Sequence, residues 1–337
     1  MRRCLAYLVV FLTLSISSSF ASSLDIPSRG KGISFGNSKK FDGLRFNLVD
    51  KDVEKINGIN LTFWIPKKNP DAVMNGLAVG LVGLSARELK GISFGTVGMA
   101  GEKITGLSVG GIGMAAGDVQ GIAIGGVGLA TGDIEGIALG GLGLASGDVD
   151  GIVIGGLGMV SQDIDGIALG GLGVGAQDIN GIAIGGLGIG AQNVTGLAIG
   201  GLGVGAQDIT GITIGGLGVG GQEITGITIG GLGVGGQDIT GITVGGSGVG
   251  GQDITGIAVG GLGVGGQNIT GLAIGGYCKA KENFTGLSIG VLNRAGRLKG
   301  VQIGLLNYCG NNPPPFRLLP IINIHLGEDL PERRHQD

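Results

Sequence analysis

Acidic side chains recur every 15 residues along this chain, and carboxylates are the groups in it best suited to bind cations. The acidic column consists of Asp118, Asp133, Asp148, Asp163, Asp178, Asp208, Glu223, Asp238 and Asp253, with Asn193 interrupting it and Asn268 and Asn283 continuing it. If successive copies stack at strand spacing, the carboxylates lie about 4.8 Å apart and repel each other unless cations screen them. We expect either weak cation binding at this edge or carboxylates that cap the amides of their own turns.

The chain has few other residues suited to catalysis. The two histidines, His325 and His335, have neither a nucleophile nor a metal-ligand partner at useful spacing. Gly-x-Gly-x-Gly runs, such as residues 201–205, lack the strand-to-helix context and the nearby lysine of a phosphate-binding loop. We therefore expect no catalytic site, no cofactor and no dedicated metal site, and hence a protein that is not an enzyme.

Cys278 and Cys309 lie near the C-terminal end of the repeats. In stacked copies they are two coils apart, roughly 9 to 10 Å at strand spacing, which exceeds the reach of a disulfide. We expect two thiols or, as the alternative, a bridge within an irregular C-terminal cap.

Threonine and glycine columns suggest two further binding surfaces. Thr213, Thr228 and Thr243 are expected to point outward in a short row, which is the pattern of an ice-binding face. The columns of Gly203 and Gly205 leave a strip of bare backbone. That strip fits either relief of crowding inside a tightly wound coil or close apposition to a second solenoid or a flat glycan.

These residues belong to a repeat whose first glycine recurs every 15 residues from Gly76 to Gly286, with outlying copies at Gly43, Gly58 and Gly300. A short period sustained this long is typical of a solenoid. A helix is excluded, because each interior glycine costs about 1 kcal/mol and every copy holds several.

The copy at residues 196–210 predicts how one coil is built. Leu197 and Ile199 alternate with Ala198, so we expect the two larger side chains to point inward. A bend at the Gly200–Gly201 pair then brings Leu202 and Val204 to the same interior, and Ile209 returns to it. The sequence therefore predicts an all-β fold, a parallel β-solenoid of about 18 coils.

A β-barrel is the alternative architecture, since 15 residues can hold one membrane-spanning strand and a turn. Three features count against it. The alternation breaks at the glycine pair, aromatic girdles are missing from the repeats, and the row expected to face outward is mostly Ala and Gly.

Charge is distributed unevenly along the chain. Residues 107–276 contain 12 acidic residues and no Lys or Arg, whereas the whole chain has a formal net charge of −3. Because such a region repels phosphate backbones, we expect no nucleic-acid partner.

The N-terminus has the pattern of a cleaved signal peptide. Arg2 and Arg3 precede a short apolar run, and small residues end at Ala21, so we expect a signal peptide at 1–21 and an exported protein. After it we expect an N-terminal capping region with irregular repeats at 22–75, the regular solenoid at 76–299, a C-terminal repeat and cap at 300–326, and a disordered charged tail at 327–337.

Two segments carry a resemblance to a known family. Residues 300–325 read GVQIGLLNYCGNNPPPFRLLPIINIH, and residues 56–64 read INGINLTFW. With the glycine repeats between them, the chain resembles the bacterial glycine-rich surface-repeat-containing proteins, a family without a defined activity. The resemblance implies export and surface exposure, and it assigns no functional residue.

Together these observations predict an exported, non-catalytic repeat protein with a structural or interaction role, located at the cell surface or outer membrane or in the extracellular medium. The expected partners are a second copy of the chain, a surface glycan or another surface protein. The alternatives are a flat-faced module that binds a glycan, a cation or ice, and, third, an outer-membrane β-barrel.

Overall fold

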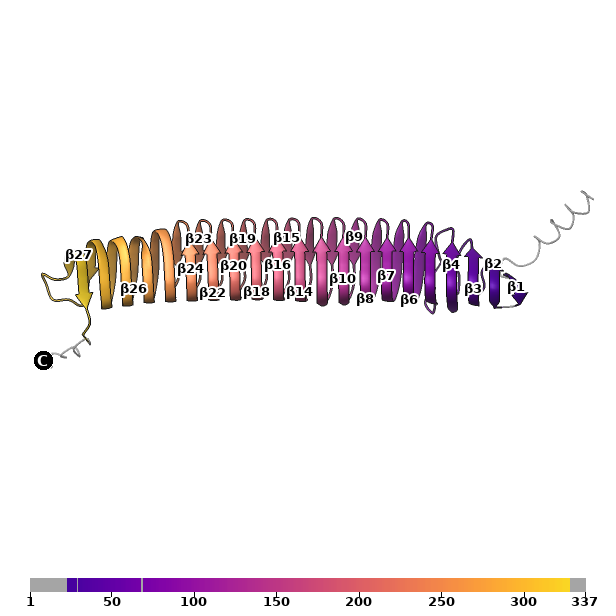
Figure 1. Ribbon diagram of the computed structural model, residues 1–337, viewed down its shortest axis with the longest axis horizontal. Coiled ribbons are helices and arrows are strands. Elements are labelled where there is room, and N and C mark those ends of the chain that lie inside the picture. Colours follow the sequence, from indigo (N-terminus) through magenta and orange to yellow (C-terminus); the bar gives the residue numbers. More distant parts are fainter. Residues whose placement is uncertain (1–22, 29, 68, 328–337) are drawn as a thin grey trace, which may run out of the picture. The chain divides into compact units, whose positions relative to one another are not determined.

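A computed structural model describes residues 23–28, 30–67 and 69–327. The chain divides into two compact units, of which unit 1 ends at Leu142 and unit 2 begins at Gly143. In the described residues the regular structure is entirely β-strand (Figure 1). The expected signal peptide lies outside the described residues, as does the expected tail beyond Gly327.

Unit 1 begins with one antiparallel strand and continues as a series of parallel strands. The first strand, β1, runs antiparallel to β2, and β2 begins the parallel series. The strands are β1 (Leu24–Ser28), β2 (Lys31–Phe35), β3 (Lys40–Asn47), β4 (Lys55–Thr62), β5 (Val73–Gly80), β6 (Gly83–Gly95), β7 (Gly98–Gly110), β8 (Gly113–Gly125), β9 (Gly128–Ala130) and β10 (Ile134–Gly140).

Unit 2 alternates short and long strands and ends in an antiparallel pair. Its short strands are β11 (Gly143–Ala145), β13 (Gly158–Val160), β15 (Gly173–Gly175), β17 (Gly188–Gly190), β19 (Gly203–Gly205), β21 (Gly218–Gly220), β23 (Gly233–Gly235) and β25 (Gly248–Gly250). Its long strands are β12 (Val149–Gly155), β14 (Asp163–Gly170), β16 (Asp178–Gly185), β18 (Asn193–Gly200), β20 (Asp208–Gly215), β22 (Glu223–Gly230), β24 (Asp238–Gly245), the continuous β26 (Asp253–Cys309) and β27 (Leu318–His325).

The strands pair in the register that the repeat predicts. In unit 2 the long strand β18 pairs in parallel with β20, Ala198 opposite Thr213, while the short strand β19 pairs in parallel with β21. Each repeat therefore closes one coil, and the chain forms the predicted parallel β-solenoid, with about 16 turns where about 18 coils were expected. The alternative, in which each repeat is one strand of a closed antiparallel sheet, is wrong, because strands one repeat apart are parallel.

The glycine that begins each repeat has a backbone conformation that other residues rarely adopt. Gly196 has a φ of 120°, and its equivalents in both units also have positive φ. A Cβ atom at Gly196 would collide with the carbonyl oxygen of Gly181 in the preceding coil. The coil-to-coil contact therefore requires glycine here, which explains the strict 15-residue period.

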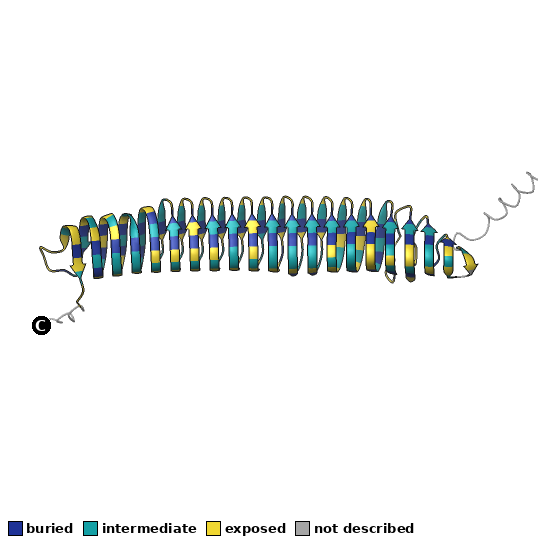
Figure 2. Cartoon of the chain, in the orientation of Figure 1, coloured by how far each residue is buried: buried dark blue, intermediate teal, exposed yellow. Residues whose placement is uncertain are grey.

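The interior of each coil is narrow, and it differs from the predicted one. Ala198 is 0% exposed, and Val204 and Ile209 are also buried, whereas Leu202 is 51% exposed and Leu197 and Ile199 are half-buried on the outside. Figure 2 shows buried and more exposed residues alternating along the coils. The inward placement of Val204 and Ile209 is confirmed, and that of Leu197, Ile199 and Leu202 is wrong.

The correction has a steric explanation. Between Ala78 and Ser288 the inward position at the middle of the long strand holds only Ala, Val, Thr or Ser, because two layers of a 15-residue coil enclose little space. The larger Leu and Ile side chains alternate with it and so point outward.

Candidate functional site

The most prominent feature of unit 2 is an apolar outer surface on its long strands. It consists of two outward positions on each long strand and a third at the glycine turn that follows. We call this surface the apolar face; its three columns are Ile152, Ile167, Ile182, Leu197, Ile212, Ile227, Ile242, Ile257 and Leu272; Ile154, Leu169, Ile184, Ile199, Ile214, Ile229, Val244, Val259 and Ile274; and Leu157, Leu172, Leu187, Leu202, Leu217, Leu232, Ser247 and Leu262.

Many side chains of the apolar face are well exposed to solvent. Ile212 is 45% exposed, Leu217 is 50% exposed and Leu262 is 75% exposed. The other members more than a third exposed are Leu157, Leu172, Ile182, Ile184, Leu187, Leu202, Ile227, Ile229, Leu232, Ile242 and Ile257. An apolar surface this continuous is unusual on a monomeric protein, which makes it the candidate site.

Backbone hydrogen bonds hold the turn column in register. The amide of Leu202 donates to the carbonyl of Leu187 at 2.5 Å, and the amide of Leu217 donates to that of Leu202 at 2.6 Å. Each leucine therefore lies directly beside the one before it. Because the backbone fixes these positions, the apolar face is pre-organised rather than assembled on binding.

Polar residues border the apolar face on one side. Thr195, Thr210 and their equivalents are exposed one position before the repeat glycine, and the acidic column lies two residues earlier. The other side leads through the glycine turn to the short strands, whose outward residues are mostly glycine. The carboxylates of unit 2 are thus gathered along one rim.

Near its C-terminal end the apolar face opens into a groove of about 720 Å³. Its apolar lining includes Ile274, Ile289, Ile303, Leu305 and Ile321. Ile321 is 73% exposed and has a φ of 69°, which is rare for a β-branched residue. Such outliers concentrate at functional positions, so this rim of the groove belongs to the candidate site.

The threonine row predicted to point outward lies inside the coils. Thr213, Thr228 and Thr243 are each 1% exposed, at the inward position that Ala198 occupies in the preceding coil. The ice-binding interpretation of this row is therefore wrong, because buried hydroxyls cannot order surface water.

Glycine occupies the two outward positions of the short strand for different physical reasons. A Cβ atom at Gly203 would lie 2.9 Å from the carbonyl oxygen of Gly218, so crowding accounts for that column. At Gly205, Gly220 and Gly250 an added Cβ atom would meet nothing within 4 Å. Crowding within the chain does not account for this second column, and close apposition of another molecule remains the hypothesis for it.

The acidic column is linked from coil to coil by side-chain amides. Asn193 donates to Asp178 at 2.6 Å, and Asn268 donates to Asp253 at 2.7 Å. Within the part of the chain that the structure describes, no three His, Cys, Asp or Glu residues are grouped so that they could hold a metal ion. The column therefore presents exposed carboxylates and amides without the geometry of a coordination site.

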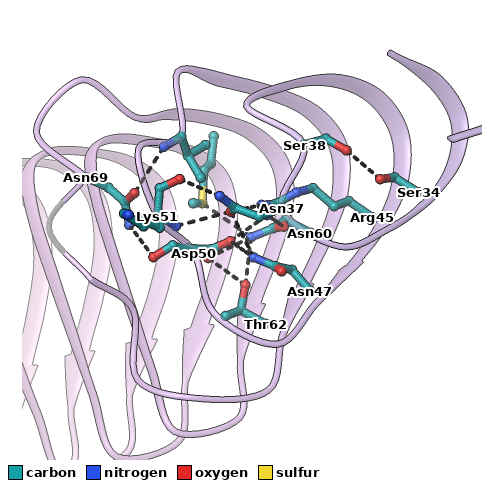
Figure 3. A network of polar contacts seen from close by, with 12 residues as sticks. Ser34, Asn37, Ser38, Arg45, Asn47, Asp50, Lys51, Asn60, Thr62 and Asn69 are labelled. Carbon is teal, nitrogen blue, oxygen red and sulfur yellow. Dashed lines mark hydrogen bonds and ion pairs between the residues drawn. The ribbon is translucent and has the colours of Figure 1, made fainter. Parts of the chain in front are cut away.

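A buried polar network occupies the N-terminal coils of unit 1 (Figure 3). Arg45 and Asp50 are both completely buried, and Arg45 Nη1 lies 2.5 Å from Asp50 Oδ1. Asp50 also accepts hydrogen bonds from Asn47 at 2.9 Å and from Thr62 at 2.6 Å, while Arg45 donates to Asn60 at 2.6 Å. The charges are paired and hydrogen-bonded, which is how a structural ion pair is stabilised in an interior.

Sequence reasoning missed this network, although the repeat register contains its signal. Arg45 pairs with Asn60, and Asn60 pairs with Ala78, so all three stand at the same inward position of successive coils. Two large polar residues at an inward position that mostly holds small side chains indicate a buried polar network.

Cys278 and Cys309 are buried thiols, which confirms the first of the two alternatives, two thiols, and not a disulfide bridge. The Cys278 side chain lies 3.7 Å from the carbonyl oxygen of Ile289, and burial raises the pKa of its thiol. The Cys309 thiol lies 3.0 Å from Asn311 Oδ1. His325 Nδ1 lies 2.7 Å from Asn312 Oδ1, in the segment that closes the C-terminal end of unit 2.

None of the described residues forms a helix that is both long and apolar enough to cross a membrane. No protein-family model, no curated protein and no solved structure matches this chain.

Proposed function

We propose that this chain is an exported, non-catalytic repeat protein with a structural or interaction role at the cell surface or in the extracellular medium, and that it acts through the apolar face of unit 2. The observation that supports the proposal is the exposure of Leu and Ile in the same outward positions of successive coils, such as Leu202, Leu217 and Leu232.

The cost of exposing this surface favours a binding role. Burying apolar area contributes about 25 cal/mol per Å², so each half-exposed Leu or Ile is a substantial unused source of binding free energy. Outward positions of a solenoid are free to be polar, as Thr195 and Asn193 are. The repeated choice of Leu and Ile therefore indicates a surface that another molecule covers.

Export is part of the proposal. It is supported by the signal-peptide pattern at residues 1–21 and by the resemblance of residues 300–325 to bacterial surface-repeat proteins. In a secreting bacterial host we expect the mature chain to begin at Ser22, which N-terminal mass spectrometry measures.

A phenyl chromatography matrix tests whether the apolar face binds. The protein is loaded at nanomolar concentration and compared with a triple variant carrying Ile212→Thr, Ile227→Thr and Ile242→Thr, which keeps β-branched residues in the strands. We expect the wild type to be retained and the triple variant to elute much earlier in a decreasing ammonium sulfate gradient.

The matched control is the triple variant Gln207→Thr, Gln222→Thr and Gln237→Thr, which changes the exposed turn at the far end of the short strands. It should elute with the wild type. If all three proteins elute together, the apolar face does not bind apolar surfaces and the proposal is wrong.

A further inference from the structure

We propose that the molecule that covers the apolar face of unit 2 is a second copy of the same chain, packed face to face. This inference rests on the proposed function, because it names the partner of the same surface. Three properties of the face support it: its area, its spacing and the position of its charges.

The area of the apolar face is sufficient for a stable dimer. Its exposed members lie between 37% and 75% accessible. Together they expose about 1,000 Å² of apolar surface, while a standard protein interface buries about 800 Å² on each partner. The face therefore meets the area requirement without any contribution from unit 1.

The spacing of the apolar side chains matches a second copy. Successive coils are hydrogen-bonded parallel strands, so side chains in one column repeat at strand spacing, about 4.8 Å. Two sheets interdigitate over many strands only if their repeats are equal, and sheets of the same sequence always satisfy that condition. A globular partner with another surface lacks this periodic match.

Charge determines how the two copies are oriented. The three columns of the apolar face contain no charged residue, and the carboxylates of unit 2, including Asp163, Asp208 and Asp238, lie along one rim. A two-fold axis parallel to the direction of coil stacking puts the acidic rim of one copy over the glycine turns of the other. A two-fold axis along the strands instead places the two acidic rims side by side, where they repel.

The proposal therefore specifies an isologous dimer in which both copies run in the same direction along the stack. Each residue at the centre of the face then lies near its own equivalent in the second copy. This holds for the middle column, for example for Ile184, which is 38% exposed, near the start of the face and for the half-buried Val244 nearer its end.

Sedimentation velocity over a concentration series tests the association. We expect the mature wild type, without detergent, to be dimeric at micromolar concentration. The triple variant Ile212→Thr, Ile227→Thr, Ile242→Thr should show a dimer dissociation constant raised at least about 100-fold, while the glutamine-turn control should match the wild type.

Cross-linking tests the orientation. Ile184→Cys and Val244→Cys, each alone, should form a disulfide-linked dimer in mild oxidant. When the two variants are mixed in equal amounts, unfolded and refolded together, cross-links should form between like chains only, because the two positions lie four coils apart. Cross-links that form only between Ile184→Cys and Val244→Cys overturn the parallel arrangement.

The outcomes separate this inference from the proposed function. The wild type can be retained on the phenyl matrix more strongly than the triple variant and still be monomeric at about 100 μM. That combination overturns the dimer and leaves the proposed function standing. A dimer that the triple variant does not weaken also overturns the inference. Equal retention of all three proteins on the phenyl matrix overturns the proposed function itself.

Discussion

Whether a side chain of this protein faces inward or outward depends on its position in the coil, since Ile209 is 1% exposed and Ile212 is 45% exposed. The inward column of unit 2 accepts Ala198, Thr213 and Ser288, all at most 1% exposed, while Leu202 beside it is half exposed. From Val153 to Ser288 this position holds only Ala, Val, Thr or Ser, so small side chains with hydroxyl groups fit the narrow interior as well as apolar ones do. Residue type alone therefore does not identify the core of so narrow a coil.

Cys278 gives a prediction at the residue scale. Burial raises the pKa of its thiol, so the folded state favours the protonated form. A group with a raised pKa stabilises the fold below its ordinary pKa, and this contribution is lost as the pH rises through the raised value. We expect the wild type to lose more stability than a Cys278→Val variant as the pH rises above the ordinary thiol pKa of about 8.5.

Urea denaturation at each pH measures this difference. Valine is a matched replacement because Val264 is also buried in the preceding coil, and like-sized apolar exchanges cost less than about 1.5 kcal/mol. Equal losses of stability in the two proteins would show that Cys278 does not resist ionisation.

At the scale of the element, the strands of each coil could be predicted from the sequence, but the direction in which their side chains point could not. The repeat glycines predict the register of the strands, because the Gly196 column admits only glycine. Hydrophobic alternation has a phase as well as a period, and the apolar-inside rule assigned the wrong phase to Leu197 and Ile199. The apolar face was hidden from sequence reasoning for the same reason.

Two Gly→Ala substitutions distinguish the glycine columns. Gly211 has a φ of 128°, and a Cβ atom there collides with the carbonyl oxygen of Gly196, so Gly211→Ala should destabilise the protein by about 2 to 4 kcal/mol. Gly220 has open space at its Cβ position, so Gly220→Ala should change stability by less than about 1 kcal/mol.

Thermal and urea unfolding of the two variants measure the difference, and the pair is matched because each adds one methyl group to a glycine of the same repeat. A Gly211→Ala protein as stable as Gly220→Ala would mean that the coil-to-coil contact can relax, and that the strict glycine period has another origin.

At the scale of the whole molecule, an antiparallel strand covers the terminal coil at the C-terminal end of unit 2. Strand β27 pairs antiparallel with the last part of β26, with Val301 opposite Ile324. Asn323 of β27 is buried, and its side-chain oxygen accepts a hydrogen bond of 2.8 Å from the buried side chain of Asn312, in the loop before the strand. A covered edge cannot template the addition of further strands.

Truncation tests this capping role. A chain that ends at Gly310 lacks β27 and should associate end to end into particles whose size rises with concentration, while a chain that ends at Leu326 keeps β27 and should not. Light scattering measures particle size, and far-UV circular dichroism confirms that both chains remain folded. Identical scattering from the two would show that β27 is dispensable as a cap.

The equal spacing of the coils has a consequence for how such a chain can change during evolution. Each coil in the regular part of unit 2 offers its neighbours nearly the same backbone surface on both sides, for example β20 between β18 and β22. Loss or duplication of one repeat by slippage during DNA replication therefore leaves every remaining junction intact. The length of the solenoid can therefore vary in single-coil steps without redesign of the core, and the area of the apolar face varies with it.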